Sequence, residues 1–299
     1  MQSKKRVIAL GFFDGVHIGH SALLRRAAQR AKELGAVPAA ITFDRSPKTM
    51  VRSSPIPLIN TAADRAYLMQ ACCGIEEVTV LEFDKALMEL PWDKFVTDIL
   101  RDRFGAVHVV AGHDYRFGHK GQGDPEKLQN LCAELGFGCD IIEKVELDGE
   151  TVSSTLVRKL IGDGEMEQAC RFLGHPHILS GTVVKGRQVG RTIGIPTANL
   201  TIPDGVIVPA YGVYATRVVT EQGSYLAVTN VGVRPTVDDG RGVTVEPWIL
   251  DFEGDLYGLT IRLEFYKQLR GERKFASLEE LKQEIELNAQ QTRAFFETV

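Results

Sequence analysis

The chain of 299 residues has few cysteines and no cysteine clusters of the kind that build structural sites. Its five cysteines are odd in number and include no CxxC pair, which argues against a disulfide framework and a zinc site. Lys and Arg (35) do not exceed Asp and Glu (39), so the basic excess typical of nucleic-acid-binding proteins is absent. No apolar run approaches the ~18 residues of a membrane-spanning helix. These absences predict a cytoplasmic protein that binds neither a membrane nor a nucleic acid.

Glycine, in contrast, is abundant, with 29 of the 299 residues. Surplus glycine usually marks tight turns or backbone that approaches a ligand closely. The length predicts two domains, because a domain typically contains ~100–200 residues.

The first half of the chain alternates short apolar runs with amphipathic stretches. The predicted strands are residues 7–13, 37–43, 77–81, 106–111 and 138–145, and the predicted helices are residues 21–34, 62–71, 92–104 and 125–135. This alternation is typical of a parallel, doubly wound α/β sheet. Such sheets bind ligands at the carboxyl ends of their strands.

The pattern changes after two short predicted helices, which lie within residues 151–161 and 165–173. The predicted strands that follow are residues 178–184, 213–219, 224–230, 243–252 and 259–265, separated by turns that contain Gly and Pro. They indicate a small antiparallel sheet or barrel. Ser277 and Glu280 form a capping box that predicts a C-terminal helix.

The tetrapeptide His17-Ile18-Gly19-His20 lies between the first predicted strand and helix. Such a junction presents free backbone N–H groups and the positive end of a helix to an anion. Two histidines three residues apart share a helix face and can both donate to a phosphate, which Gly19 allows to come close. The alternative is that both histidines only cap the helix.

This tetrapeptide occurs in class I aminoacyl-tRNA synthetases and in small adenylyltransferases. The chain has no Lys-Met-Ser-Lys-Ser-type loop and no candidate tRNA-binding domain, which argues against a synthetase. The longer string from Gly11 to His20, Gly-Phe-Phe-Asp-Gly-Val-His-Ile-Gly-His, resembles the opening motif of the FAD synthetase domain of bacterial bifunctional riboflavin kinase/FAD synthetases.

Three further stretches resemble motifs of that domain in the same order, at residues 42–44, 112–118 and 152–158. The resemblance implies catalytic roles for His17, His20 and Arg158. It implies nucleotide binding by Gly11, Phe13, Asp14, Gly19, Asp114, Arg116, Ser153, Ser154 and Thr155. Two departures stand out: Leu156 replaces an arginine of the family, and Arg-Ser-Pro at residues 45–47 replaces Pro-His-Pro.

Residues 181–200 resemble the riboflavin kinase signature, which contains Pro-Thr-Ala-Asn-Leu. The resemblance implies that Thr197 and Asn199 hold Mg²⁺ and the ATP phosphates. Oxygen ligands two residues apart on a strand share one face and suit a hard cation. Gly181, Gly186, Gly190 and Arg191 are the corresponding candidates for nucleotide binding. Tight barrel turns explain this glycine spacing equally well.

The stretch 245–252, Val-Glu-Pro-Trp-Ile-Leu-Asp-Phe, also matches the kinase family. The resemblance assigns Glu246 as the base or orienting group for the riboflavin 5′-hydroxyl, whereas its spacing alone favours a surface glutamate on an edge strand. Trp248 stands where the family commonly has histidine. Arg270 is a candidate for flavin binding.

The resulting prediction is an α/β N-terminal Rossmann-like nucleotidyltransferase domain with a parallel sheet, followed by a small antiparallel β-barrel with a C-terminal helix. We place the FMN adenylyltransferase domain at residues 1–162, a linker helix at 163–177 and the riboflavin kinase domain at 178–299. The implied reactions are riboflavin to FMN and FMN to FAD, with ATP as co-substrate and Mg²⁺ as cofactor. One alternative is a kinase whose N-terminal domain makes no FAD, and another is a non-catalytic regulator that binds flavin or nucleotide. The oligomeric state is not predicted.

Overall fold

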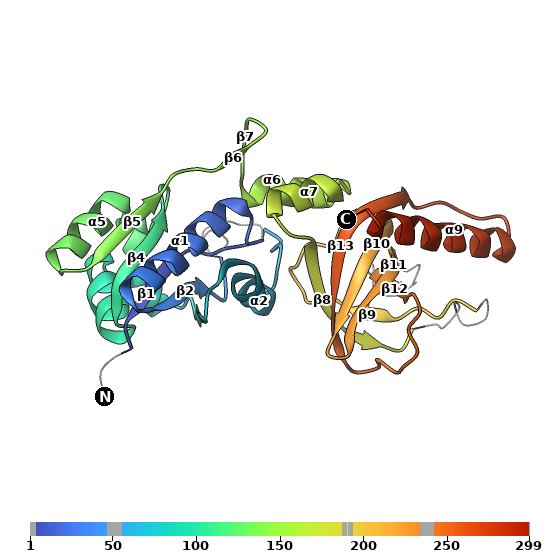
Figure 1. The fold of residues 1–299 in the computed structure, drawn as a ribbon, viewed down its shortest axis with the longest axis horizontal. Helices are drawn as coiled ribbons and strands as arrows, with labels where there is room; N and C mark the ends of the chain where they lie inside the picture. Colours follow the sequence, from blue (N-terminus) through green and yellow to red (C-terminus); the bar gives the residue numbers. More distant parts are fainter. Residues whose placement is uncertain (1–3, 47–55, 187–189, 191–193, 234–241, 299) are drawn as a thin grey trace. The chain divides into compact units, whose positions relative to one another are not determined.

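The computed structural model describes residues 4–46, 56–186, 190, 194–233 and 242–298, which fold into two compact units (Figure 1). The first unit consists of Met1–Ile56 and Thr61–Ser154, and the second of Pro57–Asn60 and Thr155–Val299. Among the described residues, no helix combines the length and apolar character needed to cross a membrane.

The first unit is built around a parallel sheet with helices between its strands. Its elements are β1 (Arg6–Leu10), α1 (Ile18–Leu34), β2 (Val37–Phe43), α2 (Ala62–Cys73), β3 (Glu77–Leu81), α3 (Lys85–Glu89), α4 (Trp92–Lys94), the π-helix η1 (Phe95–Arg103), β4 (Ala106–Gly112), the short 3₁₀-helix η2 (His119–Gly121), α5 (Pro125–Glu134), β5 (Gly138–Ile142) and the small hairpin β6 (Glu146–Leu147) and β7 (Glu150–Thr151). The strand order is β3-β2-β1-β4-β5, and all neighbours in this sheet are parallel. The predicted α/β class is confirmed. The order in which the strands follow one another reverses between β1 and β4. Sheets of this kind bind ligands beside the carboxyl ends of the strands at such a point.

The first strand is shorter than the apolar run predicts. It ends at Leu10 instead of residue 13, because the backbone turns away at Phe13, whose φ is 57°. The predicted helix at 92–104 is mostly the π-helix η1. Its buried residues Phe95, Val96 and Leu100 recur at a spacing of one and then four, which the wider π turn places on one face.

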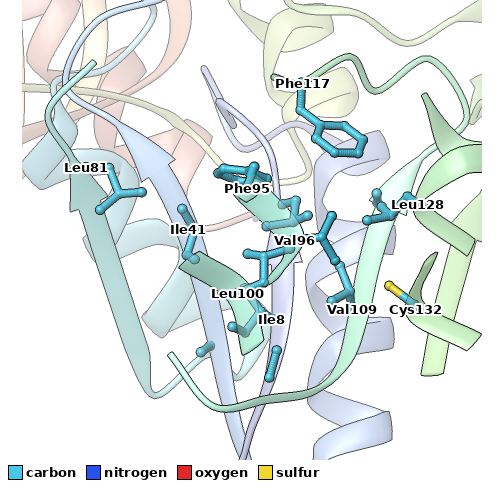
Figure 2. Packing of buried hydrophobic residues seen from close by; sticks show 14 of the residues in the cluster. Ile8, Ile41, Leu81, Phe95, Val96, Leu100, Val109, Phe117, Leu128 and Cys132 are labelled. Atoms are coloured by element: carbon cyan, nitrogen blue, oxygen red, sulfur yellow. The ribbon is translucent and has the colours of Figure 1, made fainter. Parts of the chain in front are cut away.

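One hydrophobic cluster of this unit lies between the sheet and the helices that follow β3 and β4 (Figure 2). Ile8, Ile41 and Val109 from three adjacent strands pack against Val96 and Leu100 of η1. All of these side chains are at most 2% exposed. Val7 and Ala9, which alternate with Ile8 along β1 and so point to the other face, are also 0% exposed. Burial on both faces explains why this strand is apolar.

Helix α1 is tied to the sheet by a charged cluster around Asp140 of β5. The Asp140 carboxylate accepts hydrogen bonds from Arg26 Nε at 2.7 Å and from Arg30 Nε at 2.8 Å, and His108 Nε2 lies 3.3 Å away. Burial alone would raise the pKa of Asp140, but the hydrogen bonds from Arg30 and Arg26 outweigh it and lower the pKa to about 2. The cluster fixes the helix whose first turn carries His20.

We expect Asp140→Asn to destabilise the first unit by about 1–2 kcal/mol at pH 7, between the values for exposed and buried ion pairs. Because the pKa of Asp140 lies below its ordinary value of 3.8, the carboxylate stabilises the fold above about pH 4 and loses this effect toward pH 2. Denaturant titrations at several pH values should therefore show the difference from wild type shrinking below pH 4. Asp102→Asn, at an exposed pair, is the control and should leave stability unchanged. An Asp140→Asn protein as stable as wild type at pH 7 would contradict this role.

The second unit is a barrel of antiparallel strands accompanied by helices. Its elements are α6 (Ser154–Asp163), α7 (Met166–Leu173), β8 (His177–Val184), β9 (Asn199–Thr201), β10 (Gly212–Thr220), β11 (Gly223–Val233), β12 (Val243–Ile249), β13 (Thr260–Gly271) and α9 (Leu278–Phe296). The order is β12-β11-β10-β13-β8-β9, and the Ala198 N–H donates to the Pro247 carbonyl at 2.9 Å, which joins the two ends of the sheet. The predicted antiparallel barrel with a C-terminal helix is confirmed.

Several boundaries in this unit differ from the sequence prediction, and two strands show it clearly. The strand predicted at 243–252 ends at Ile249, because Asp251 has a positive φ of 56° and the chain turns there. The strand predicted at 259–265 continues to Gly271 as β13. The Ser277 hydroxyl caps α9 by accepting from the Glu280 N–H at 3.1 Å, as predicted.

Candidate active sites

The segment between β1 and α1 passes through an unusual backbone conformation. Phe13 (φ 57°), Gly15 (φ 83°) and Val16 (φ 41°) all have positive φ. For a bulky or β-branched residue this conformation is strained, and such strain concentrates at functional sites. The side chains of Phe13 and Val16 are buried, which holds the turn. Gly11 begins it, and a Cβ at this position would come within 2.9 Å of the Phe13 ring.

His17 and His20 lie face to face at the start of α1. Their rings stack with centroids 3.6 Å apart and an interplanar angle of 14°. His17 is the N-cap residue and not part of the helix, so the pair meets by capping and not by the shared helix face that the spacing predicts. Gly19 permits this arrangement, because a Cβ there would press on the His17 ring at 3.2 Å.

The surroundings define the protonation of both rings. The His20 backbone N–H donates to Nδ1 of His17 at 3.3 Å, so in the neutral ring the proton of His17 sits on Nε2. Burial, and then the nearby His17 and Arg65, hold the pKa of His20 well below its ordinary value. Nδ1 of His20 is buried and has no hydrogen-bond partner among the described residues. The site therefore offers stacked imidazoles, of which His20 is neutral at physiological pH.

Two later segments of the first unit bring candidate residues to the same edge of the sheet. The Ser154 hydroxyl donates to the Asp14 carbonyl at 3.0 Å, which joins the predicted Ser-Ser-Thr motif to the β1–α1 loop. Asp14 itself is 2% exposed. After β4, the neighbour of β1, the exposed Asp114 and Arg116 follow, and Arg116 lies 3.6 Å from Asp124.

The remaining candidates of this motif set are placed as follows. Ser153 directly precedes α6. Thr155 and Arg158 belong to the second unit, where Arg158 Nε donates to the Pro57 carbonyl at 2.8 Å. The structure thus groups the two histidines with Asp14 and Ser154, and the catalytic role of Arg158 stays a prediction.

In the second unit, Asn199 is the first residue of β9, and Thr197 lies two residues earlier, in a segment without regular secondary structure. The strand argument for two oxygen ligands on one face therefore does not apply, because only Asn199 lies in a strand. Asn199 is 7% exposed and packs against Gly186, where a Cβ would lie 2.3 Å from its amide nitrogen. The absence of a side chain at Gly186 leaves the space that the Asn199 amide group occupies.

The other glycine candidates also stand at close approaches. A Cβ on Gly181 would lie 2.8 Å from the Thr201 carbonyl oxygen, and one on Gly190 would lie 2.1 Å from that of Ile195. Arg191 lies outside the described residues. At Gly181, Gly186 and Gly190 alike, the close neighbours belong to the segment of residues 195–202.

A cavity of about 380 Å³ opens between the two ends of the barrel sheet. Asn199 and Thr201 of β9 line one side, and Thr244 of β12 lines the other. The segment that follows β9, residues 202–206, completes the wall. The predicted ligand Asn199 therefore faces the space next to the strand that carries Glu246.

Glu246 lies in the middle of β12, half-buried, and is paired in register with Asn230 of β11. Asn230 pairs in turn with Val213 of β10, and Val213 with Arg270 of β13. Residues in register across antiparallel strands point to the same face. Glu246 and Arg270 therefore share one face of the sheet, the face on which Val213 packs with Ala289 of α9.

Arg270 is anchored by helix α9. Its Nε lies 3.2 Å from Asn288 Oδ1 and 3.2 Å from Glu284, and its guanidinium group stacks over Phe275. Burial lowers the pKa of Arg270, partly offset by Glu284. Trp248, which replaces the family histidine, packs in the apolar cluster between the sheet and α9. These apolar surroundings suit tryptophan.

One residue beside the first site, Arg65, is absent from the residues predicted from the sequence. Arg65 of α2 is fully buried beside the β1–α1 loop and donates to the Phe12 carbonyl. The only signal was its position in the helix, on the same face as the buried Leu68 and Met69, where an apolar residue is expected.

Comparison with known proteins assigns a family to each half of the chain. The family model of FAD synthetase matches residues 1–156, and that of riboflavin kinase matches residues 173–296. A bifunctional riboflavin kinase/FMN adenylyltransferase of Listeria monocytogenes is 36% identical over 97% of this chain and 92% of its own length. The Pseudomonas fluorescens protein of the same description is 37% identical over 96% of this chain and 92% of its own length.

A solved structure shows the same fold over nearly the whole chain. It is a Streptococcus pneumoniae protein described as a macrolide-efflux protein, with a TM-score of 0.85 and 32% identity, covering 98% of this chain and 95% of the other. The motif order, the two folds and the matches over almost the full length lead to one conclusion: this chain belongs to the bifunctional riboflavin kinase/FMN adenylyltransferase family.

Proposed function

We propose that the two sites of this chain carry out the two reactions of its family, each with ATP. The β1–α1 site adenylylates FMN to FAD, and the barrel site phosphorylates riboflavin to FMN. We assign the first activity to residues 1–162 and the second to residues 178–299, with residues 163–177 as the linker helix. The observation that carries the first assignment is the stacked pair of His17 and His20 at the edge where the strand order reverses.

In the adenylylation step, a phosphate oxygen of FMN attacks the α-phosphorus of ATP. A new P–O bond forms as the bond to the leaving pyrophosphate breaks, so no covalent enzyme intermediate is required. His17 donates from Nε2, and His20 and Arg158 stabilise the charge on the pentavalent phosphorus. Positioning and charge stabilisation supply the catalysis.

In the kinase step, the riboflavin 5′-hydroxyl loses its proton to the Glu246 carboxylate as its oxygen bonds to the γ-phosphorus of ATP, and ADP leaves. A base or orienting group at the acceptor hydroxyl is a general requirement of phosphoryl transfer. Arg270, on the same sheet face as Glu246, binds the flavin.

Mg²⁺ would be held by Thr197 and Asn199 together with the ATP phosphates. The donor set fits this ion, because a hydroxyl and an amide oxygen are neutral oxygen ligands of the kind that a hard cation takes, and Asn199 lines the cavity. When bound, the ion neutralises charge on the transferred phosphoryl group.

We expect Asn199→Ala to raise the Mg²⁺ concentration for half-maximal FMN formation about tenfold or more, as the loss of one ligand weakens a metal site. The measurement is a Mg²⁺ titration of the kinase reaction at saturating ATP. The matched control is Asn130→Ala, at an exposed position of α5 in the first unit. An unchanged Mg²⁺ dependence would remove Asn199 from the metal site.

The alternative with a specific observation in its favour is a kinase whose first unit makes no FAD, because Leu156 replaces an arginine of the family motif. Purified protein supplied with FMN, ATP and Mg²⁺ separates the two. FAD and pyrophosphate formed in equal amounts support the bifunctional assignment, and FMN recovered unchanged refutes it. A cytoplasmic location, predicted from the sequence, is part of the same proposal.

A further inference from the structure

Arg65 is a buried cation in the first unit that the reaction scheme above does not use. It lies on α2, and its side chain is 0% exposed. Burying a guanidinium group is costly, and an apolar side chain of similar size is often as stable in such a place. A buried arginine beside a binding loop therefore calls for an explanation from its contacts.

The guanidinium group joins the ends of two neighbouring strands. Nη1 donates to the Phe12 carbonyl and to the Thr42 hydroxyl at 3.0 Å, and Nη2 donates to the Phe43 carbonyl at 2.8 Å. The Thr42 hydroxyl in turn donates to the Phe12 carbonyl at 2.8 Å. The group also stacks on the Phe12 ring, 4.2 Å from its centroid.

These acceptors are uncharged, so Arg65 does not form a direct ion pair among the described residues, although Asp14 and Asp44 act on it through space. Its Nε is buried without a hydrogen-bond partner in the described part of the chain. Phe12 immediately precedes Phe13, whose positive φ begins the turn toward the stacked histidines. The guanidinium group of Arg65 thus fixes the peptide at which β1 turns into the loop.

We propose that Arg65 is a positioning residue for adenylylation: by holding the Phe12 carbonyl against the end of β2, it sets the strained turn that places His17 and His20. The inference rests on the proposed function of the first unit. Positioning acts on the transition state more than on substrate affinity, because misplaced groups lose contacts that form as the bond changes. Arg65 touches no reacting atom in this scheme.

The test compares Arg65→Met, Arg65→Lys and the exposed control Arg103→Met in the full chain. Each protein is assayed for kcat and KM in FAD formation from FMN, and for FMN formation from riboflavin as an internal measure of intact protein. We expect Arg65→Met to lower kcat for FAD about a hundredfold or more, with both KM values within about threefold and kinase activity within about twofold. Arg65→Lys should lower kcat for FAD formation about tenfold, because an ammonium group keeps the charge but not the planar arrangement of donors. Arg103→Met should match wild type.

A second readout does not depend on FAD synthesis. Because the rings of His17 and His20 stack, the ring current of each imidazole shifts the NMR resonances of the other's ring protons. We expect these resonances to move in Arg65→Met and Arg65→Lys and to stay in place in Arg103→Met. Unmoved resonances in folded Arg65→Lys protein, or losses confined to KM, would overturn the inference. If the wild-type protein makes no FAD but the His17 and His20 resonances move in the Arg65 variants, the adenylyltransferase assignment is refuted. The role of Arg65 in positioning the histidines is then still supported.

Discussion

Replacing Glu246 with glutamine should lower kcat for FMN formation by about 10²–10⁴-fold, the usual loss when a general base is removed. Glutamine keeps the size and the hydrogen-bonding capacity of the side chain on β12 but cannot accept the proton of the riboflavin hydroxyl. FAD formation from supplied FMN should be unchanged, because it uses the first unit. Initial rates with each substrate, measured on the same preparation, provide the comparison.

The matched control for this variant is Glu221→Gln in the exposed β10–β11 turn, which should keep both activities. If Glu246→Gln forms FMN at a rate close to wild type, Glu246 is not the base. A loss of both activities would indicate a folding defect, which circular dichroism and thermal melting detect. Glu246→Asp, which retains the carboxylate, then distinguishes the chemical role from the structural one.

Replacing His20 with alanine should lower kcat for FAD formation by about 10²–10³-fold, the range found when one donor to a developing charge is removed. The stacked pair implies coupling, so His17→Ala with His20→Ala should lose much less than the product of the single effects. Riboflavin phosphorylation should be unaffected. Rates with FMN and with riboflavin, measured side by side, check both expectations.

His175→Asn in the second unit serves as the control, because His175 does not belong to either proposed site. FAD formation by His20→Ala at a rate within a few fold of wild type would show that the histidine pair is a helix cap without a catalytic role. That outcome would agree with the capping geometry of His17, whose Nδ1 accepts from the His20 N–H.

The architecture could be predicted from the sequence because its signals are local. Buried parallel strands read as short apolar runs, and helices end at glycines such as Gly35 and Gly74, which have positive φ. Strand β3 was predicted at the residues where it occurs, Glu77–Leu81. Strand β9 is absent from the predicted strands, because three residues in a glycine-rich segment carry no alternation, although the argument for Thr197 and Asn199 assumed a strand at these two residues.

The candidate sites could be predicted less completely, because they depend on contacts between distant residues. The motif string predicted that His17 and His20 act together. Their stacking depends on the turn at Phe13 and Val16, which have positive φ. The sequence did not predict this turn, because apolar residues rarely adopt positive φ. The shared sheet face of Glu246 and Arg270 depends on a register across four strands. Arg65 reaches the loop from a distant helix, as its 53-residue separation from Phe12 shows.

The most direct test of a chain with two successive activities is a time course with riboflavin, ATP and Mg²⁺ alone. Riboflavin, FMN and FAD are separated at each time point and quantified by fluorescence. The account predicts that FMN appears first and that FAD follows after a lag, with ATP consumed in both steps. Riboflavin that stays unchanged, or FMN that accumulates without FAD while ATP remains, would contradict it.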